Sequence, residues 1–189
     1  MSTDKPGRIA RPLYRSLYRL VAASLLLALA LLLPFLTGQI PQIGGMLCPM
    51  HLPVLLCGFL CGPVWGLAVG AIAPLLRNLL FGMPPLFPKA IAMAFELMTY
   101  GLLSGLLSRL MPKKPVFLWV SLILSMIGGR LVWGAARFAL AGFDATAFPF
   151  SAFVAGAVTE AIPGILLQLV LVPPVVLLLR RAGYDPEQT

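Results

Sequence analysis

A long stretch without charged side chains most constrains how this chain can fold. Residues 50–82 are apolar and rich in glycine, and they carry no Lys, Arg, Asp or Glu before Arg77. Between Gly58 and Gly70 a glycine recurs every four residues, a spacing that lets two helix backbones approach closely within a membrane. Pro63 interrupts this pattern, because proline is tolerated in the first turn of a helix but not in its interior. The stretch therefore predicts a short helix, a tight turn at Pro63 and a second helix, which together form the centre of the protein.

Composition places the chain in a membrane. Hydrophobic residues make up 60% and charged residues 11% of the 189 residues, which indicates an integral membrane protein without a soluble domain. Residues 1–19 carry five basic side chains against one acid, and an apolar run follows from Leu20 to Phe35. We interpret these segments as a cytoplasmic tail and a first membrane helix, not as a signal peptide, because no clear cleavage site follows. The membrane domain is expected over 20–182, before a C-terminal tail over 183–189.

The apolar runs predict an all-α integral membrane protein, a bundle of six transmembrane helices. A hydrocarbon core of about 30 Å requires roughly 20 helical residues per span. The predicted spans are 20–36, 52–62 (a short one), 63–82, 86–109, 116–141 and 152–179. The predicted outer loops 37–51, 83–85 and 142–151 contain no Lys or Arg. Basic residues occur instead in the tail 1–19, at Arg109, Lys113 and Lys114, and at Arg180 and Arg181. This distribution predicts that both termini are cytoplasmic.

Ionisable side chains fall within the predicted spans, where each is costly unless it is paired or hydrated. They are Arg77, Lys89, Glu96, Arg130, Arg137 and Glu160. With the predicted topology, all of them lie near the midplane or in the outer half of the membrane. Helical spacing gathers polar residues on one face of each of the last three spans, which predicts a pocket open to the outer side. The candidate binding residues are Arg130, Trp133, Arg137, Glu160, Glu96, Lys89, Arg77, Asn78, Tyr100 and His51.

An alternative interpretation is that these charges only form ion pairs that hold the bundle together. Glu160 would then pair with Arg130, and Glu96 would pair with Arg77. The set does not balance, because four cations within the spans face two acids. A buried cation without a counter-charge is costly, so a bound anion, a partner or water has to satisfy it.

The excess of cations leads to an expectation about the ligand. We expect a carboxylate or another electron-rich polar group, bound by Arg130 or Arg137. The flat ring of Trp133 would contact an apolar or cyclic portion of the same molecule.

Metal binding and catalysis fit the sequence poorly. Cys48 and His51 could share a metal ion, but no third ligand stands at a fixed spacing from them. Two of the three cysteines lie in predicted spans, so a disulfide framework is not expected. Neither a nucleotide-binding loop nor a Ser–His–Asp set can be assembled. We therefore expect a binding protein that is not an enzyme and that needs no cofactor.

Several features together resemble the substrate-binding S components of energy-coupling factor (ECF) vitamin transporters. They are the basic N-terminal tail, a long loop after the first span, six short spans and the segment HLPVLLCGFLCGPVWGLAVGAIAPLL. The similarity covers nearly the whole chain. It is strongest at His51-Leu52-Pro53, at Gly58 and at Gly62-Pro63 followed by Trp65-Gly66. This motif is similar to the folate, pantothenate and hydroxymethylpyrimidine branches and does not select a substrate among them.

The resemblance implies a six-helix bundle that captures a vitamin or precursor on the outer side, beneath a lid formed by the loop after the first span. It also implies partners, namely a membrane-embedded coupling subunit and two cytoplasmic ATPase subunits, in a bacterial or archaeal cytoplasmic membrane. In the family, a patch of small residues on the first helix contacts the coupling subunit. The nearest match in this chain is Ser24 and Ala28.

Two other classes of function are open from the sequence. A self-sufficient secondary transporter would couple transport to a proton carried by Glu96 or Glu160, and inverted repeats would favour it. The segments 20–82 and 116–179 show no convincing similarity, and we expect no broken helix pair beyond the turn at Pro63. A membrane scaffold is the other class, but it would leave the charges of the pocket unexplained.

Overall fold

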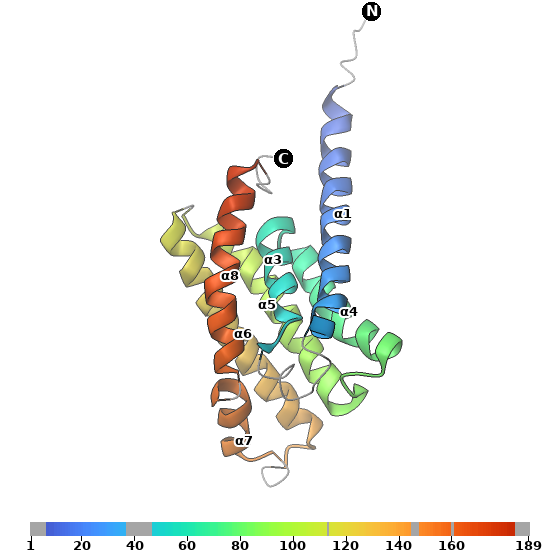
Figure 1. Cartoon of the computed structure of the whole chain (residues 1–189), viewed down its shortest axis with the longest axis vertical. Coiled ribbons are helices and arrows are strands. Elements are labelled where there is room, and N and C mark those ends of the chain that lie inside the picture. Colours follow the sequence, from blue (N-terminus) through green and yellow to red (C-terminus); the bar gives the residue numbers. More distant parts are fainter. Residues whose placement is uncertain (1–6, 37–46, 113, 145–147, 160, 184–189) are drawn as a thin grey trace, which may run out of the picture.

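The computed structural model describes residues 7–36, 47–112, 114–144, 148–159 and 161–183. Every regular element within these ranges is helical (Figure 1). The elements are α1 (Gly7–Leu36), α3 (His51–Cys61), α4 (Pro63–Phe81), η1 (Leu86–Ala90), α5 (Ile91–Leu110), α6 (Pro115–Leu140), α7 (Phe150–Val154), η2 (Ala155–Thr159) and α8 (Ile162–Arg181). The predicted all-α class is confirmed for the part of the chain that the structure describes.

Five segments are long and apolar enough to cross a membrane. They are Ser16–Leu36, Pro63–Phe81, Leu86–Leu110, Pro115–Leu140 and Phe150–Arg181. The remaining predicted span, 52–62, corresponds to α3, whose 11 residues cover only about 16 Å at 1.5 Å per residue. This length is about half of a hydrocarbon core, so α3 is shorter than a full span. The chain is a multi-pass helical membrane protein.

The turn between α3 and α4 forms at Gly62 and Pro63, as predicted. Gly62 has φ 98° and ψ 175°, a conformation that glycine adopts without steric cost, and its N–H donates to the Gly58 carbonyl at 3.1 Å. Pro63 is the first residue of α4. The guanidinium of Arg109 lies over Gly62, so that a side chain at this position would collide with it.

The predicted strip of glycines packs against α5. A Cβ on Gly66 would collide with the backbone of Gly101, and one on Gly70 would collide with the backbone of Leu97. The close approach of two helix backbones is therefore confirmed. The 50–82 stretch contacts α1, α5 and α8, and α5 contacts α3, α4 and α6, so α3, α4 and α5 together form the centre of the bundle.

The predicted span 152–179 is not one continuous helix. The chain forms α7 and η2 and turns at Ala161 before α8 begins (Figure 1). Pro163 lies in the first turn of α8, where it has no N–H to donate and its ring excludes the carbonyl four residues earlier. The segment η1 also departs from a regular helix, since Phe87 within it has φ −108° and ψ 134°. The expectation of no broken helix beyond Pro63 is wrong.

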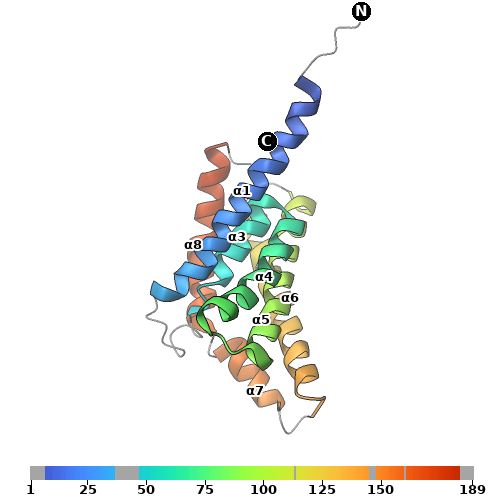
Figure 2. The same ribbon diagram turned by 90° about the vertical axis from the view of Figure 1, so that its right-hand side faces the viewer.

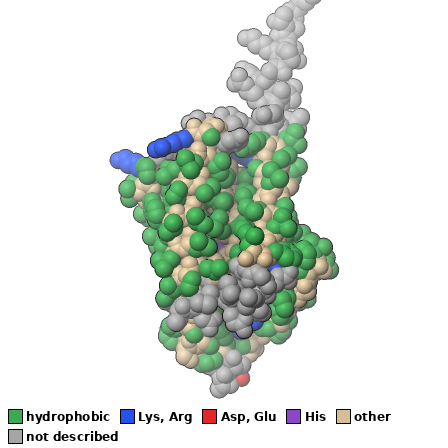
Figure 3. All heavy atoms as spheres, in the orientation of Figure 1, with side chains coloured by type: hydrophobic (Ala, Val, Ile, Leu, Met, Phe, Trp, Pro, Cys, Tyr) green, Lys and Arg blue, Asp and Glu red, His purple; other side chains and the backbone are tan. Residues whose placement is uncertain are grey.

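The first helix begins and the last helix ends on the same side of the bundle. Figures 1 and 2 both show the start of α1 and the end of α8 at one end of the molecule, with α7 at the opposite end. Figure 3 shows a largely hydrophobic flank, with Lys and Arg side chains at the end where α8 finishes. Lys114 and Arg180 line the same hollow at this end. Basic residues thus gather at the end of the bundle where α8 finishes.

Candidate functional site

The site begins at the turn that leads into α3. The N–H of His51 donates to the Cys48 carbonyl at 3.0 Å, and Cys48 has φ 47°. This turn makes His51 the first residue of α3 and buries its side chain. Burial raises the pKa of the Cys48 thiol, so that Cys48 is a neutral thiol at neutral pH.

Glu96 of α5 lies between His51 and Arg130. Its Oε1 is 3.2 Å from Nε2 of His51 and 3.0 Å from Nη1 of Arg130, and Glu96 is 1% exposed. Glu96 Oε1 makes no well-aligned hydrogen bond to either neighbour, so both contacts are mainly electrostatic. Arg130, near the middle of α6, also places Nη2 3.6 Å from Sγ of Cys48.

Tyr100 lies one helical turn from Glu96, toward the Leu110 end of α5. Its hydroxyl hydrogen bonds to the Glu96 carboxylate, and its ring meets the His51 ring edge-on at 5.3 Å. Gly129 of α6 makes room for Tyr100, because a Cβ at this position would collide with the ring. We call the set Cys48, His51, Glu96, Tyr100 and Arg130 the central cluster.

Several buried polar atoms lack a hydrogen-bond partner among the described residues. They are Nδ1 and Nε2 of His51, Oε1 of Glu96, Nε of Arg130, Oε1 of Gln168 and Nε of Arg180. A buried polar atom without a partner costs about 1–3 kcal/mol, and such atoms are rare in native interiors. The central cluster contributes most of them. A polar ligand that accepts from Arg130 and donates to Glu96 would satisfy the unpaired atoms of these two side chains.

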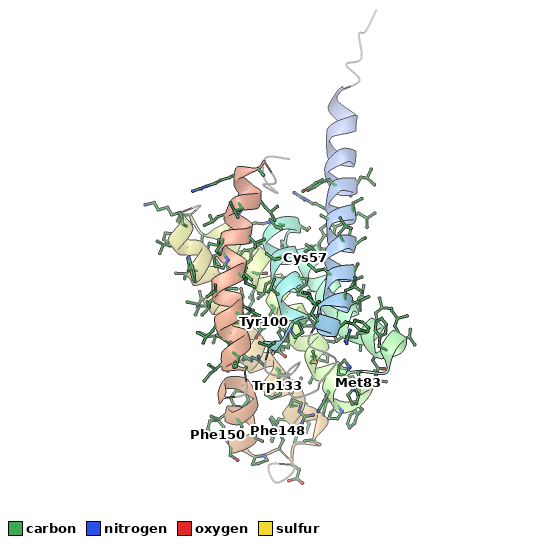
Figure 4. All side chains as sticks on the ribbon, in the orientation of Figure 1. Cys57, Met83, Tyr100, Trp133, Phe148 and Phe150 are labelled. Carbon is green, nitrogen blue, oxygen red and sulfur yellow. The ribbon has the colours of Figure 1, made fainter. Side chains whose placement is uncertain are left out.

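A second group of residues lies toward α7. Trp133 of α6 meets Phe148 edge-on at 6.0 Å and stacks against Phe153 at 6.3 Å. The guanidinium of Arg137 lies 5.4 Å from the centroid of the Phe148 ring. Figure 4 shows Trp133 and Phe148 between Tyr100 and the α7 end of the molecule. We call Trp133, Phe148 and Phe153 the aromatic group.

Arg77 does not pair with Glu96, and that predicted ion pair is wrong. Its Nη1 donates to the Leu31 carbonyl of α1 at 2.6 Å. The guanidinium also lies over the rings of Phe35 and Phe81, at 5.1 and 5.4 Å from their centroids. A carbonyl and two aromatic faces satisfy this cation without a carboxylate. Arg77 therefore connects α4 to α1, and it accounts for part of the excess positive charge.

The remaining predicted binding residues lie apart from the central cluster or outside the described ranges. Nδ2 of Asn78 donates to the Pro84 carbonyl at 2.8 Å, which ties the end of α4 to the loop that follows. Lys89 is exposed on η1. Glu160 lies outside the described residues, so its pairing with Arg130 stays a prediction. The predicted lid over 37–51 is described only from residue 47 onward.

The predicted docking residues lie on the open face of α1. Ser24 and Ala28 are both exposed, and the Ser24 hydroxyl donates to the Leu20 carbonyl of its own helix at 2.9 Å. The large apolar side chains of Leu25 and Leu32 are exposed beside them. Figure 2 shows α1 running along the outside of the bundle. This face is available to lipid or to a partner protein.

Some members of these groups were missing from the predicted site. The contact of Cys48 with Arg130 joins residues 82 positions apart in the chain, which spacing cannot reveal. The sequence did not identify Phe148 and Phe153 as site residues, because aromatic residues are common in apolar segments.

The central cluster is suited to binding. Within the described ranges, no group of three His, Cys, Asp or Glu side chains could hold a metal ion. A guanidinium, a carboxylate and an imidazole held in one buried place can recognise a small polar molecule by charge-assisted hydrogen bonds.

Fold and site together define a class of protein, namely a multi-pass membrane protein with a buried cluster of ionisable side chains. A family model described as the substrate-specific component of ECF transporters matches residues 18–176. Because the match covers most of the chain, the protein belongs to this family. It is therefore a substrate-binding component of a transporter, and it associates with the other subunits of an ECF transporter module. Neither a curated protein nor a solved structure matches the chain.

Proposed function

We propose that the chain is the specificity subunit of an ECF-type ABC importer in a bacterial or archaeal cytoplasmic membrane. It captures a small water-soluble vitamin or vitamin precursor on the outer side, and partner subunits drive uptake with ATP. The observation that carries this proposal is the central cluster, in which Glu96, Arg130 and His51 meet in the interior and retain polar atoms without partners. Family membership supports the transport role, and the cluster supports the binding chemistry.

The geometry of the cluster favours a ligand with both a donor and an acceptor. Arg130 already lies 3.0 Å from Glu96, so the charges of these two side chains largely cancel. A simple anion would approach Arg130 but would be repelled by Glu96. A zwitterion, or a ring that carries both an electron-rich atom and an N–H or O–H, would contact both side chains. Its cyclic portion would then lie against Trp133 in the aromatic group, with Arg137 at the outer edge.

The distribution of basic residues supports an orientation in the membrane. Lys114 and Arg180 lie at the end where α1 begins and α8 ends, and Lys and Arg favour the cytoplasmic side. The α7 end then faces outward, and the aromatic group lies between the outer surface and the central cluster. A ligand from outside would pass these rings before it reaches Arg130.

The exposed face of α1 supports the expected partners. Ser24 and Ala28 are small and exposed, and small residues let helix backbones approach closely within a membrane. We assign this face to the membrane-embedded coupling subunit, which would transmit the work of two ATPase subunits.

Calorimetric titration of the purified chain tests the proposal. Folate, pantothenate and hydroxymethylpyrimidine are the first probes, and we expect saturable 1:1 binding of a vitamin of this kind. Glu96→Gln should weaken that binding by at least tenfold, because the ligand loses a charged acceptor. The exposed Arg181 offers a control, and Arg181→Ala should bind as the wild type does. If no water-soluble vitamin binds, or if Glu96→Gln keeps the full affinity, the proposal is wrong.

A further inference from the structure

A polar hollow lies at the basic end of the molecule. It is open to the surface, it is formed where α5 and α8 end and α6 begins, and Ser108, Lys114 and Arg180 line it. Ser108 is eight residues beyond Tyr100 along α5, which places the hollow about 12 Å further along that helix than the central cluster. Because the hollow is shallow and open, it could receive only a small group, such as a single headgroup or an inorganic anion, at its rim.

The polar side of this hollow offers hydrogen-bond donors. Nη2 of Arg180 donates to the Ser108 hydroxyl at 2.6 Å, which orients the guanidinium. Nε of the same side chain is buried and has no hydrogen-bond partner among the described residues. The carboxylates that the structure describes are Glu96 and Asp144, and neither lines the hollow. The cation is therefore oriented and retains a donor for an anion.

The start of α6 adds to the positive potential. Lys114 immediately precedes Pro115, the first residue of α6, and this helix has no side-chain cap and no acidic residue in its first turn. The N-terminal end of a helix carries a partial positive charge and favours anions such as phosphate. Lys114, Arg180 and the end of α6 therefore act on the same small volume.

The other wall of the hollow is apolar. Met111, Phe117 and Leu118 line it, and α6 continues from there with the exposed side chains of Val116 and Trp119. A ligand that binds here can thus place a charged group against Arg180 and an apolar portion along α6. An anionic phospholipid has this combination of groups.

We propose that this hollow binds a phosphate group, supplied by the headgroup of an anionic phospholipid in the cytoplasmic leaflet. Anionic lipids concentrate in that leaflet, and each Lys or Arg near the membrane surface attracts them. The phosphate accepts from Arg180 and Lys114 and lies at the start of α6. The acyl chains then follow the apolar surface of α6. A free phosphate ion shares the headgroup chemistry but lacks the acyl chains.

Titration of short-chain lipids into the purified full-length chain in a zwitterionic detergent tests this proposal. Short-chain phosphatidylglycerol, short-chain phosphatidylcholine and inorganic phosphate are the probes. We expect phosphatidylglycerol to bind more tightly than phosphatidylcholine. Arg180→Gln should weaken phosphatidylglycerol binding by about fivefold or more, because the phosphate loses a charged hydrogen-bond donor that contacts it directly. Lys114→Gln should act in the same direction, and because its side chain is exposed this variant keeps the test valid if Arg180→Gln fails to fold.

Arg181→Gln is the matched control, because Arg181 is the next residue of α8, carries the same charge and is exposed. It should bind phosphatidylglycerol within twofold of the wild type. If inorganic phosphate binds as tightly as the lipid, the hollow is a phosphate site, but its ligand is a phosphate ion from solution and not a lipid headgroup. Equal binding of phosphatidylglycerol by the wild type, Arg180→Gln and Lys114→Gln would overturn the proposal, as would equal binding of the two lipids.

Discussion

Replacement of Arg130 by alanine perturbs the central cluster most directly. The change removes the cation that lies 3.0 Å from Glu96, whose side chain is 2% exposed. Breaking a buried ion pair by removing one partner usually costs about 3–5 kcal/mol of folding stability. The Arg130 side chain is itself 13% exposed, so water can partly replace it, and we expect a loss near the lower end of this range.

The same change removes a donor from the proposed ligand site. Loss of a buried, charge-assisted hydrogen bond costs about 2–5 kcal/mol of binding free energy when the partner is left unpaired. Since about 1.4 kcal/mol corresponds to a factor of ten, Arg130→Ala should weaken vitamin binding by roughly thirtyfold or more. Calorimetric titration measures this affinity, and thermal unfolding of the same samples measures the stability.

A double variant separates the binding role of Arg130 from its structural role. In Arg130→Met with Glu96→Gln, neither buried charge remains, so the melting temperature should return toward that of the wild type. The affinity should not return, because the ligand still lacks its charged partners. If the double variant recovers both stability and affinity, Arg130 only neutralises Glu96, and the proposed site is wrong.

Three further predictions concern packing, partners and topology. Gly101→Val should lower the melting temperature markedly, because the added side chain collides with the backbone of Gly66, whereas a valine at the exposed Ala135 should have little effect; equal melting temperatures would contradict the packing. Ser24→Leu combined with Ala28→Leu should abolish uptake in cells while calorimetry finds ligand binding intact, and normal uptake would exclude this face as the docking surface. An impermeant thiol reagent on intact cells should label a cysteine placed at Phe150 and spare one placed at Ala182. Background labelling should be low, because the three native cysteines are buried. The reverse labelling would show that the topology is inverted.

The positions of most helices and the close approach of α4 to a neighbouring helix could be predicted from local sequence patterns. The apolar runs predicted the segments that can cross a membrane, and the glycine spacing predicted that α4 meets a neighbour at backbone distance. Pro63 predicted the turn because its ring allows only the first turn of a new helix. Pro163 has the same chemistry, but the predicted span 152–179 ran through it, and the break before α8 was missed.

The partners of the buried charges could not be predicted from spacing. Helical periodicity places Arg130 on one face with Trp133, but it does not tell which neighbouring helix Glu96 or Arg77 faces. Arg77 contacts the Leu31 carbonyl and the rings of Phe35 and Phe81. A comparison of the numbers of cations and acids cannot predict such uncharged partners. His51 was included for its position near the outer end of its helix, and its contact with Glu96 depends on how α3 packs against α5.

Transport by purified components tests the central claim most directly. The chain should be reconstituted into two sets of vesicles, one with the chain alone and one with the chain, the coupling subunit and the two ATPases of an ECF module. A labelled vitamin that the chain binds is then added outside the vesicles. We predict that the chain alone binds the vitamin but does not accumulate it, and that the complete module accumulates it only when ATP is supplied to the ATPases. Uphill accumulation by the chain alone, driven by a proton gradient, would contradict the account and identify a secondary transporter.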